Sequence, residues 1–392
     1  MILKDDLKSI NKEDLESLIE NEIQEDNTLE YKRDNPLDSR EGKQKFLEAI
    51  SSFANSNGGD LIIGLEVDSE SKLPKRLVGI ATPSIDETIR GLDDIIRQGI
   101  QLRLSDYSVS TIPLDGSYYA IIYRIRKSWI GPHRVILYGL DKFFSRGAAG
   151  KYPMDVFQLK SAFLMSQTRV DMIKSFISER ISHIYINNMP VPIRKGPKVI
   201  LHVIPFNAFD PENSLNLQEN ERFITQLMTL DNRYGILKYN IDGIIKIDES
   251  PSNKDNFAYI QFYRNGIIES VEGKFLIDED AKCIPLVKFE ENLIKSVDNY
   301  LKVLKDLNIN PPILVQISIA NIKNCSRCIS SHFSGEKPTE IHKDIIQLPE
   351  AIIQNYDIMG EMVLHNALDA LSNACGLPKS SNYDDKGHWK RP

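Results

Sequence analysis

The sequence predicts an α+β fold in two domains. Amphipathic segments with helix-period apolar positions are interspersed along the chain with short aliphatic runs of strand length. The chain has 392 residues, of which 41% are hydrophobic and 26% charged, as in a globular protein of about two or three domains. A Pro-rich stretch, "NNMPVPIRKGP" at residues 187–197, separates the halves and is the expected linker.

The first half is predicted to form a mixed sheet with flanking helices. We expect helices over residues 9–24, 39–55, 84–100 and 155–167, strands over 28–33, 60–67, 75–80, 107–116 and 118–128, and a hairpin over 132–154. The clearest helix, 39–55, places Phe46, Ile50 and Phe53 on one face. It ends in "NSNGG", whose residues tolerate the left-handed backbone of a sharp turn.

The second half is predicted to be α+β as well. We expect strands over residues 198–206, 235–247, 257–277 and 312–322, and helices over 290–307 and 358–375. The domains are therefore 1–167 and 198–392, joined by a connecting helix and linker over 168–197. The second domain has no assigned role; dimerisation or partner binding is the expectation, and the polar tail 378–392 is predicted to fray.

Composition restricts the compartment and the partners. No run of about 18 apolar residues is present and the acidic N-terminus is unlike a targeting segment, so we expect a cytoplasmic protein with no membrane partner. The cysteines, which are confined to the last third, argue against a secreted disulfide framework. Cys325 and Cys328 have the spacing of half a zinc site but lack a second pair, so we expect cysteines that are buried or incidental instead of zinc ligands. A net charge of −7 means that nucleic-acid binding would require local basic patches or metal ions.

The stretch "EDNTLEYKRDN", residues 25–35, combines acidic and basic residues at close spacing. Glu25 and Glu30 lie five positions apart, and Lys32 follows closely. In a strand, Glu30 and Lys32 share one face while Tyr31 points to the other and packs. A solvated turn with local ion pairs explains these charges, and so does a site that binds a metal or a phosphate.

Several motifs, in order along the chain, resemble those of the Schlafen AlbA-2 domain in its bacterial form. They are "LEYKRDN", "FLEAISSFANSNGGDLIIGLE", "LVGI" and "FFSRGAAGKYPMDVFQL", and the resemblance covers about residues 9–167. The resemblance implies an N-terminal AlbA-2-like domain of mixed sheet and helices. Members of the family are described as DNA-binding or ATP-binding modules, whereas animal Schlafen proteins are endoribonucleases that use three carboxylates and a divalent metal.

The resemblance places two of the family's acids at Glu25 and Glu30, ahead of Lys32, whose ammonium group would neutralise charge at the scissile phosphate or hold the adjacent one. The third acid falls in "GLEVDSE", where an ungapped match places Val67 at the position of the acid. Either a one-residue shift lets Asp68 serve, or Glu66 reaches the same metal. Carboxylate oxygens suit Mg2+ or Mn2+, which would polarise the phosphate and activate water. The candidate metal ligands are Glu25, Glu30, Glu66 and Asp68, and the candidate catalytic residues are Glu25, Glu30, Lys32 and Asp68.

Basic residues mixed with aromatic ones follow in the later hairpins. The candidate nucleic-acid contacts are Arg124, Arg126, Lys127, Arg134, Lys142, Arg146 and Lys151. Such a surface suits phosphate contact and base stacking, although solvated arginines and core aromatics are an equal alternative. Asn55 either contacts a phosphate or metal-bound water, or shapes the turn. Gly58 and Gly59 do not form a P-loop, because no Gly-Lys-Ser/Thr follows them.

The leading functional hypothesis is a metal-dependent endoribonuclease that cleaves structured RNA such as transfer RNA, in a bacterium as part of antiphage defence. The competing hypothesis is a non-catalytic regulator that binds RNA or DNA through the same surface. A third is an ATP-binding accessory protein, which the missing P-loop disfavours. A homo-oligomer formed through the second domain is compatible with each of them.

Overall fold

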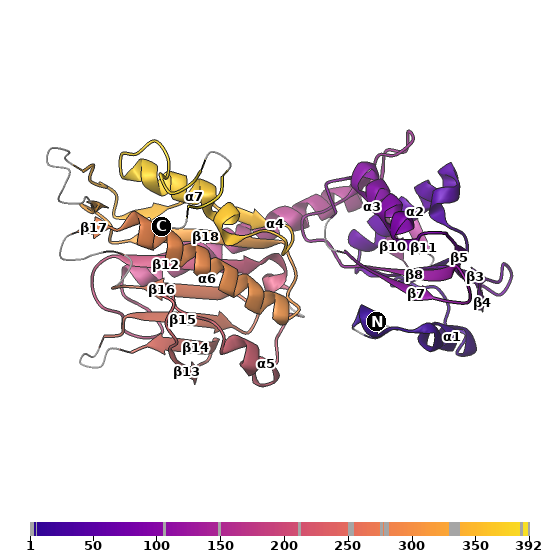
Figure 1. The fold of residues 1–392 in the computed structure, drawn as a ribbon, viewed down its shortest axis with the longest axis horizontal. Coiled ribbons are helices and arrows are strands. Elements are labelled where there is room, and N and C mark those ends of the chain that lie inside the picture. The colour runs from indigo at the N-terminus through magenta and orange to yellow at the C-terminus, as the bar shows by residue number, and fades with distance from the viewer. Residues whose placement is uncertain are drawn as a thin grey trace. The chain divides into compact units, whose positions relative to one another are not determined.

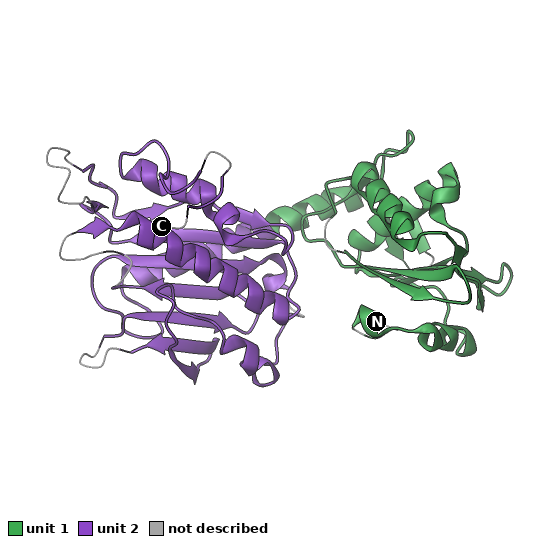
Figure 2. Ribbon diagram, viewed as in Figure 1, with its two compact units in different colours: residues 1–168 green, residues 169–392 purple. Residues whose placement is uncertain are grey.

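The computed structural model describes residues 4, 6–104, 107–147, 150–210, 213–249, 255–274, 277, 282–328, 338–384 and 387–390. The chain divides into two compact units, Met1–Thr168 and Arg169–Pro392, which are coloured separately in Figure 2. Both units combine helices with sheets, so the predicted α+β class is confirmed. None of the described helices is long and apolar enough to span a lipid bilayer.

The first unit contains two larger sheets (Figure 1). Its helical elements are η1 (Leu7–Ser9), α1 (Lys12–Glu20), η2 (Pro36–Asp38), α2 (Arg40–Ala54), α3 (Ile85–Gly99) and the start of α4 (Val156–Tyr185). Its strands are β1 (Leu29–Lys32), β2 (Gly59–Ile63), β3 (Leu65–Val67), β4 (Pro74–Leu77), β5 (Ile80–Ala81), β6 (Ile100–Gln101), β7 (Tyr107–Pro113), β8 (Tyr118–Ile125), β9 (Arg134–Val135), β10 (Lys142–Gly147) and β11 (Gly150–Pro153). Among the described residues, one sheet has the order β1-β2-β8-β5 with β7 on β8, and the other β11-β10-β9-β6.

The sheet that contains β1 packs apolar side chains on both faces. Phe46 of α2 meets Tyr123 of β8 edge to face, with ring centroids 5.3 Å apart. On the opposite face, Tyr31 of β1 packs in the cluster that includes Leu15 of α1. Because successive strand residues point to opposite faces, Glu30 points towards the α2 side, as alternation predicts.

The turn after α2 is fastened by one amide side chain. Asn55 accepts a hydrogen bond from the backbone N–H of His133 at 2.7 Å and donates to the carbonyls of His133 and Phe144 at 2.9 Å. Gly58 has a φ of 78°, and a Cβ there would lie 2.7 Å from the carbonyl oxygen of Ile125. Asn55 therefore shapes the turn, which was the second of its two predicted roles.

We predict that Asn55→Ala lowers the free energy of unfolding by about 2 kcal/mol, because three backbone groups lose their hydrogen-bond partner. Urea denaturation followed by circular dichroism measures the difference. Asn57→Ala is the matched control, since Asn57 is exposed in the same turn. Equal effects of the two variants would contradict the role of Asn55.

The second unit is built on a large antiparallel sheet (Figure 1). Its helical elements are the rest of α4, η3 (Phe206–Phe209), α5 (Leu217–Ile224), α6 (Leu286–Asp306) and α7 (Gly360–Ala374). Its strands are β12 (Lys198–Pro205), β13 (Ile236–Tyr239), β14 (Gly243–Asp248), β15 (Ala258–Tyr263), β16 (Ile268–Glu272), β17 (Cys283–Ile284), β18 (Ile313–Ala320), β19 (Ser326–Arg327), β20 (Ile345–Gln347) and β21 (Ala351–Ile353). Within the described ranges the large sheet has the order β13-β14-β15-β16-β12-β18-β20, with β21 also on β18, while β17 and β19 form a separate parallel pair.

One face of the large sheet packs against α6 and α7, which cross it in Figure 1. Leu201 of β12 and Phe262 of β15 belong to the same buried cluster as Phe289 of α6 and Leu368 of α7. The alternate residues of the strands point to the opposite face, which carries polar groups as well as aliphatic ones.

Helix α4 is one continuous helix of 30 residues, where two separate helices were expected. Its second half is fixed to the second unit by Arg180, whose guanidinium donates to both carboxylate oxygens of Glu269 at 2.8 and 2.9 Å. Tyr259 donates to the same carboxylate, and His202 lies 3.0 Å from it. An isoleucine stripe buries the same side of the helix, at Ile173, Ile177, Ile181 and Ile184. Residues 156–185 contain no Pro or Gly, so the sequence is compatible with this continuous helix and did not require the expected break.

The Pro-rich segment 187–197 is paired with the second unit instead of forming an open linker. The N–H of Arg194 donates to the carbonyl of Asn256, and the N–H of Asn256 donates to that of Pro192, both at 3.0 Å. Ile193 between them is buried. Proline lacks an N–H but keeps its carbonyl, so the segment can still pair along one edge.

The polar tail after α7 is also held, in contrast to the expectation that it frays. Glu290 of α6 is buried and accepts hydrogen bonds from Ser380, Asn382 and the Nε1 of Trp389. Tyr383 is buried and donates its hydroxyl to a backbone carbonyl of α7. The polar composition of the tail predicts fraying, but in the structure its polar side chains donate hydrogen bonds to one buried carboxylate, that of Glu290.

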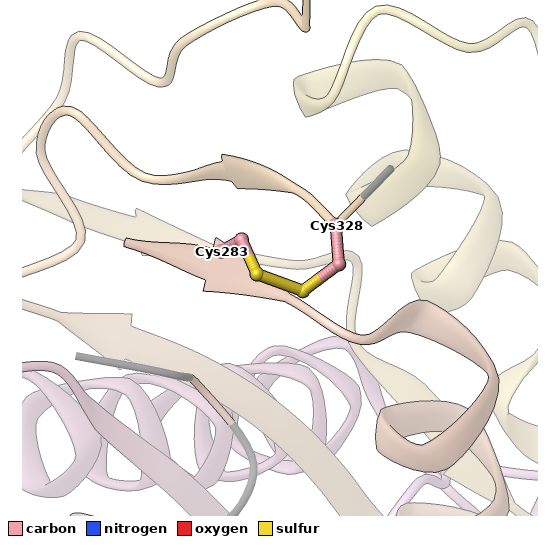
Figure 3. The surroundings of a disulfide bond; sticks show 2 residues. All are labelled: Cys283 and Cys328. Carbon is pink, nitrogen blue, oxygen red and sulfur yellow. A yellow bond between two sulfur atoms is a disulfide. The ribbon is translucent and has the colours of Figure 1, made fainter. Parts of the chain in front are cut away.

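The cysteines differ in part from the prediction that they are buried or incidental. Cys325 and Cys375 are buried and free, whereas Cys328 forms a disulfide with Cys283 (Figure 3). Cys325 is therefore buried, as one of the two alternatives had it, whereas Cys328 is exposed and forms a disulfide that neither alternative included. The two bonded cysteines are 45 residues apart, so the Cys-x-x-Cys spacing gave no indication of this pairing.

Candidate functional site

A cavity of about 480 Å³ opens beside β1 in the first unit. It is lined by Gln24, Glu25, Asp26, Glu30, Lys72, Arg146, Gly150 and Lys151. These residues come from the segment before β1, from β1 itself, from the turn between β3 and β4, and from the β10–β11 hairpin. The cavity thus gathers acids and bases from four separate parts of the chain.

Three charged residues of the cavity wall and the neighbouring Lys32 form a group that we name the Glu30 cluster: Glu30, Lys32, Arg146 and Lys151. Lys32 and Lys151 donate to Oε1 of Glu30 at 2.6 and 3.1 Å, and Arg146 donates to Oε2. Arg146 and Lys151 are paired directly across the β10–β11 hairpin, which brings both side chains to the same carboxylate. The guanidinium of Arg146 also lies over the ring of Phe53, 4.0 Å from its centroid.

The cluster keeps Glu30 ionised. Burial alone would raise the pKa of this carboxyl group. The positive charges of Lys32, Lys151 and Arg146 outweigh burial and lower the pKa from 4.5 to about 2. Glu30 is therefore a stable anion in the folded protein, with three cations around it.

We predict that Glu30→Gln lowers the free energy of unfolding at pH 7 by about 2–3 kcal/mol, because it leaves three neighbouring cations without their anion. Since the folded pKa is depressed, the stabilisation is present above pH 4.5 and is lost as the pH falls from 4.5 to about 2. Urea titrations at several pH values test this.

The control for this measurement is Glu70→Gln, which removes the same charge from an exposed side chain. It should leave stability nearly unchanged at every pH. A difference between Glu30→Gln and the wild type that is constant from pH 7 to about pH 2 would refute the electrostatic role of Glu30.

Glu25 is the second acid of the predicted trio at the cavity, and its side chain is hydrogen-bonded to the backbone of β1. Its Oε1 accepts a hydrogen bond from the backbone N–H of Tyr31 at 2.7 Å. Asp26, which was not predicted, also lines the cavity and caps the turn into β1 by accepting from Thr28. Glu25 and Glu30 therefore reach the same cavity, each through different contacts.

The remaining two acids lie on the β3–β4 hairpin and have partners of their own. Glu66 forms ion pairs with Arg33 at 3.7 Å and Arg76 at 3.1 Å. Asp68 accepts from the backbone N–H groups of Ser71 and Glu70, and these bonds lower its pKa to about 2. Neither acid lines the cavity that holds Glu25 and Glu30.

Val67 occupies the position at which an ungapped family match would place an acid. A β-bulge between Glu66 and Val67 shifts the pairing register with β4, and Val67 packs against the apolar cluster on the α1 side. Within the described ranges, no group of three or more His, Cys, Asp or Glu side chains is arranged to hold a metal ion. The donors as arranged do not fit a three-carboxylate metal centre, because each acid is satisfied separately.

The predicted basic surface is divided between buried and accessible residues. Arg124 is buried and pairs with Asp60 at 2.8 and 3.0 Å, so it stabilises the sheet and is not exposed to a ligand, contrary to the prediction. Arg146 and Lys151 belong to the Glu30 cluster. Arg134 pairs with Asp141 at 3.1 Å.

The other predicted basic residues remain at the surface of the first unit. Lys142 is exposed, while Arg126 and Lys127 are half-buried. The Nζ of Lys127 lies 4.6 Å from the ring centroid of Trp129, so this aromatic side chain is already paired with a cation. The structure thus brings only part of the predicted surface to the cavity.

Lys72 is the cavity residue that sequence reasoning missed most completely. It lies in the β3–β4 turn with a φ of 61°, and no local pattern distinguishes it from other exposed lysines. Gln24 and Asp26 flank Glu25, so their proximity to the predicted site was a usable signal. Gly150 follows from the Gly-rich loop in the β10–β11 hairpin.

Residues 25–155 match the model of the family described as Schlafen, AlbA_2, so the first unit contains a Schlafen AlbA-2 domain. No curated protein matches the chain. Among solved structures that match is the solution NMR structure of the N-terminal domain of a RecG-related protein from Nitrosomonas europaea. That match has 19% sequence identity and a TM-score of 0.23, and covers 28% of this chain and 71% of the other. The family assignment indicates a function related to nucleic acids.

Proposed function

We propose that the first unit binds nucleic acid at the cavity beside β1, without requiring a metal centre for binding. The observation that supports this most directly is the Glu30 cluster, in which three cations surround one carboxylate. An ammonium group has three N–H donors, so Lys32 and Lys151 can contact a phosphate oxygen while still paired with Glu30. Both side chains are 19% exposed, and Lys151 lines the cavity while Lys32 lines a neighbouring pocket along β1.

The mixed charge of the cavity wall suits a nucleotide better than a bare phosphate. Lys72 and Lys151 are cations that can pair with phosphate oxygens. Glu25 and Asp26 on the same wall offer carboxylate oxygens, which accept hydrogen bonds from sugar hydroxyls and base amino groups. A single-stranded segment can present both kinds of group, because its bases are not paired.

We expect Lys151→Ala to weaken the binding of a short single-stranded RNA or DNA roughly ten-fold at moderate salt, because one phosphate contact is lost. The slope of log K against log salt should become shallower by about 0.7. Fluorescence anisotropy at several salt concentrations measures both quantities for the purified full chain.

Lys302→Ala is the matched control for Lys151→Ala, because Lys302 is exposed on α6 and its loss changes the net charge equally. Its binding curve should overlay that of the wild type. If both variants weaken binding to the same extent, the effect is one of net charge and the proposed site is incorrect. No binding by the wild type at low salt would reject the proposed function itself.

The second candidate is the endoribonuclease, with structured RNA such as transfer RNA as substrate and Mg2+ or Mn2+ as cofactor. Its support is that Glu25 and Glu30 reach the same cavity, with Lys32 next to them. Against it, Glu30 accepts from three cations and the hairpin acids are engaged elsewhere. This arrangement leaves the acids of the cavity and of the hairpin engaged in other contacts, so no metal-assisted cleavage step follows from it.

We expect transfer RNA to remain intact when it is incubated with the wild-type protein and either metal, because both oxygens of Glu30 are already bound. Denaturing gels read the result. Cleavage that requires metal and is lost in Glu25→Gln, but not in Glu70→Gln, would establish the nuclease as the function instead. Glu70 is an exposed acid outside the cavity.

A further inference from the structure

The second unit contains a disulfide that lies partly in solvent, in a chain whose other two cysteines are buried. Cys328 is exposed and Cys283 is half-buried, and their sulfur atoms are bonded (Figure 3). Cys325 and Cys375 are 2% and 1% exposed, and burial raises the pKa of both thiols. The disulfide between Cys283 and Cys328 is therefore accessible to a redox partner in solution, whereas the two buried thiols are not.

The disulfide joins two short strands whose pairing, within the described residues, is brief. Strands β17 and β19 pair over two residues. The backbone N–H of Ser326 donates to the carbonyl of Lys282, and that of Cys328 to the carbonyl of Ile284, each at 3.0 Å. Strand β17 lies immediately before α6, so the covalent bond ties the start of this core helix to the segment that follows β18.

We propose that Cys283 and Cys328 form a reversible thiol–disulfide site, which fastens the start of α6 when oxidised and releases it when reduced by a small thiol. Cys328 is exposed and Cys283 is half-buried, so a small thiol can reach the bond between them. Exposed disulfides are reduced more readily than buried structural ones, and are of the exchangeable kind.

The exchange balances with two molecules of the small thiol. The thiolate of the first attacks Sγ of Cys328, the more exposed of the two residues, and the bond to Cys283 breaks. Cys283 leaves as a thiolate and takes a proton from water. A second thiol attacks the sulfur of the small thiol in the mixed disulfide, releasing Cys328 and a small-molecule disulfide. The protein gains two electrons and two protons, and the two thiols lose them.

Release of this bond should loosen the strand pair without unfolding the core. Ile284 is fully buried in the main cluster of the second unit and keeps its apolar contacts after reduction. The backbone N–H groups of Ser326 and Cys328, by contrast, depend on a pairing of two residues. Their hydrogen exchange should therefore report the state of the disulfide.

The first test is differential alkylation of the full chain, purified without reductant and analysed by mass spectrometry. Cys283 and Cys328 should be blocked in the native protein and become alkylated together after native treatment with dithiothreitol or excess reduced glutathione. Alkylation of both residues without reductant would overturn the proposal. So would a disulfide that opens only in denaturant, since it would then be purely structural.

The second test is hydrogen exchange of the amides of Ser326 and Cys328, which should rise at least about ten-fold on reduction. A Cys283→Ser/Cys328→Ser variant should exchange at the fast rate whether reduced or not. Cys325→Ser is the matched control, because it removes a buried thiol three positions from Cys328 and should respond as the wild type does. If reduction leaves the hydrogen exchange of these two amides unchanged in the wild type, the disulfide does not stabilise the strand pair and the proposal is wrong.

Discussion

The first unit depends on how one buried carboxylate is neutralised. Glu30 points from β1 towards α2, where an ionised group without partners would cost several kcal/mol. Lys32 comes from the same strand, but Arg146 and Lys151 come from the β10–β11 hairpin. The charge on Glu30 thus holds a hairpin from the second sheet against a strand of the first, and the cavity forms where they meet.

The same neutralisation shapes what the cavity can do. A carboxylate that accepts hydrogen bonds from three cations is a poor ligand for a divalent metal, which would have to displace them. Lys151 lines the cavity, and of the three N–H donors of its ammonium group two are taken by Glu30 and the carbonyl of Lys45. The arrangement therefore suits the proposed phosphate recognition better than metal binding, although Glu25 and Glu30, which the sequence analysis named as candidate metal ligands, both line the cavity.

Buried carboxylates organise the second unit in the same manner. Glu269 receives Arg180 and thereby fixes half of α4 to the sheet, and the charge-assisted hydrogen bonds outweigh burial to lower its pKa to about 2. Glu290 accepts hydrogen bonds from three neutral donors of the tail: Ser380, Asn382 and Trp389. Burial accordingly raises the pKa of Glu290. In each case a segment that sequence reasoning treated as loosely attached is tied down by one acid.

The sequence by itself determined the local elements and the family of the first unit. Apolar periodicity predicted α2, the Asn-Gly turn followed from residue chemistry, and strand alternation placed Glu30 and Lys32 on one face. Only the tertiary structure decided which groups meet Glu30, because Arg146 and Lys151 lie 116 and 121 residues away and no periodicity reports such contacts. The disulfide between Cys283 and Cys328 was undetected for the same reason. Local patterns record how a segment is buried, whereas long-range pairs depend on how the sheets bring distant segments together.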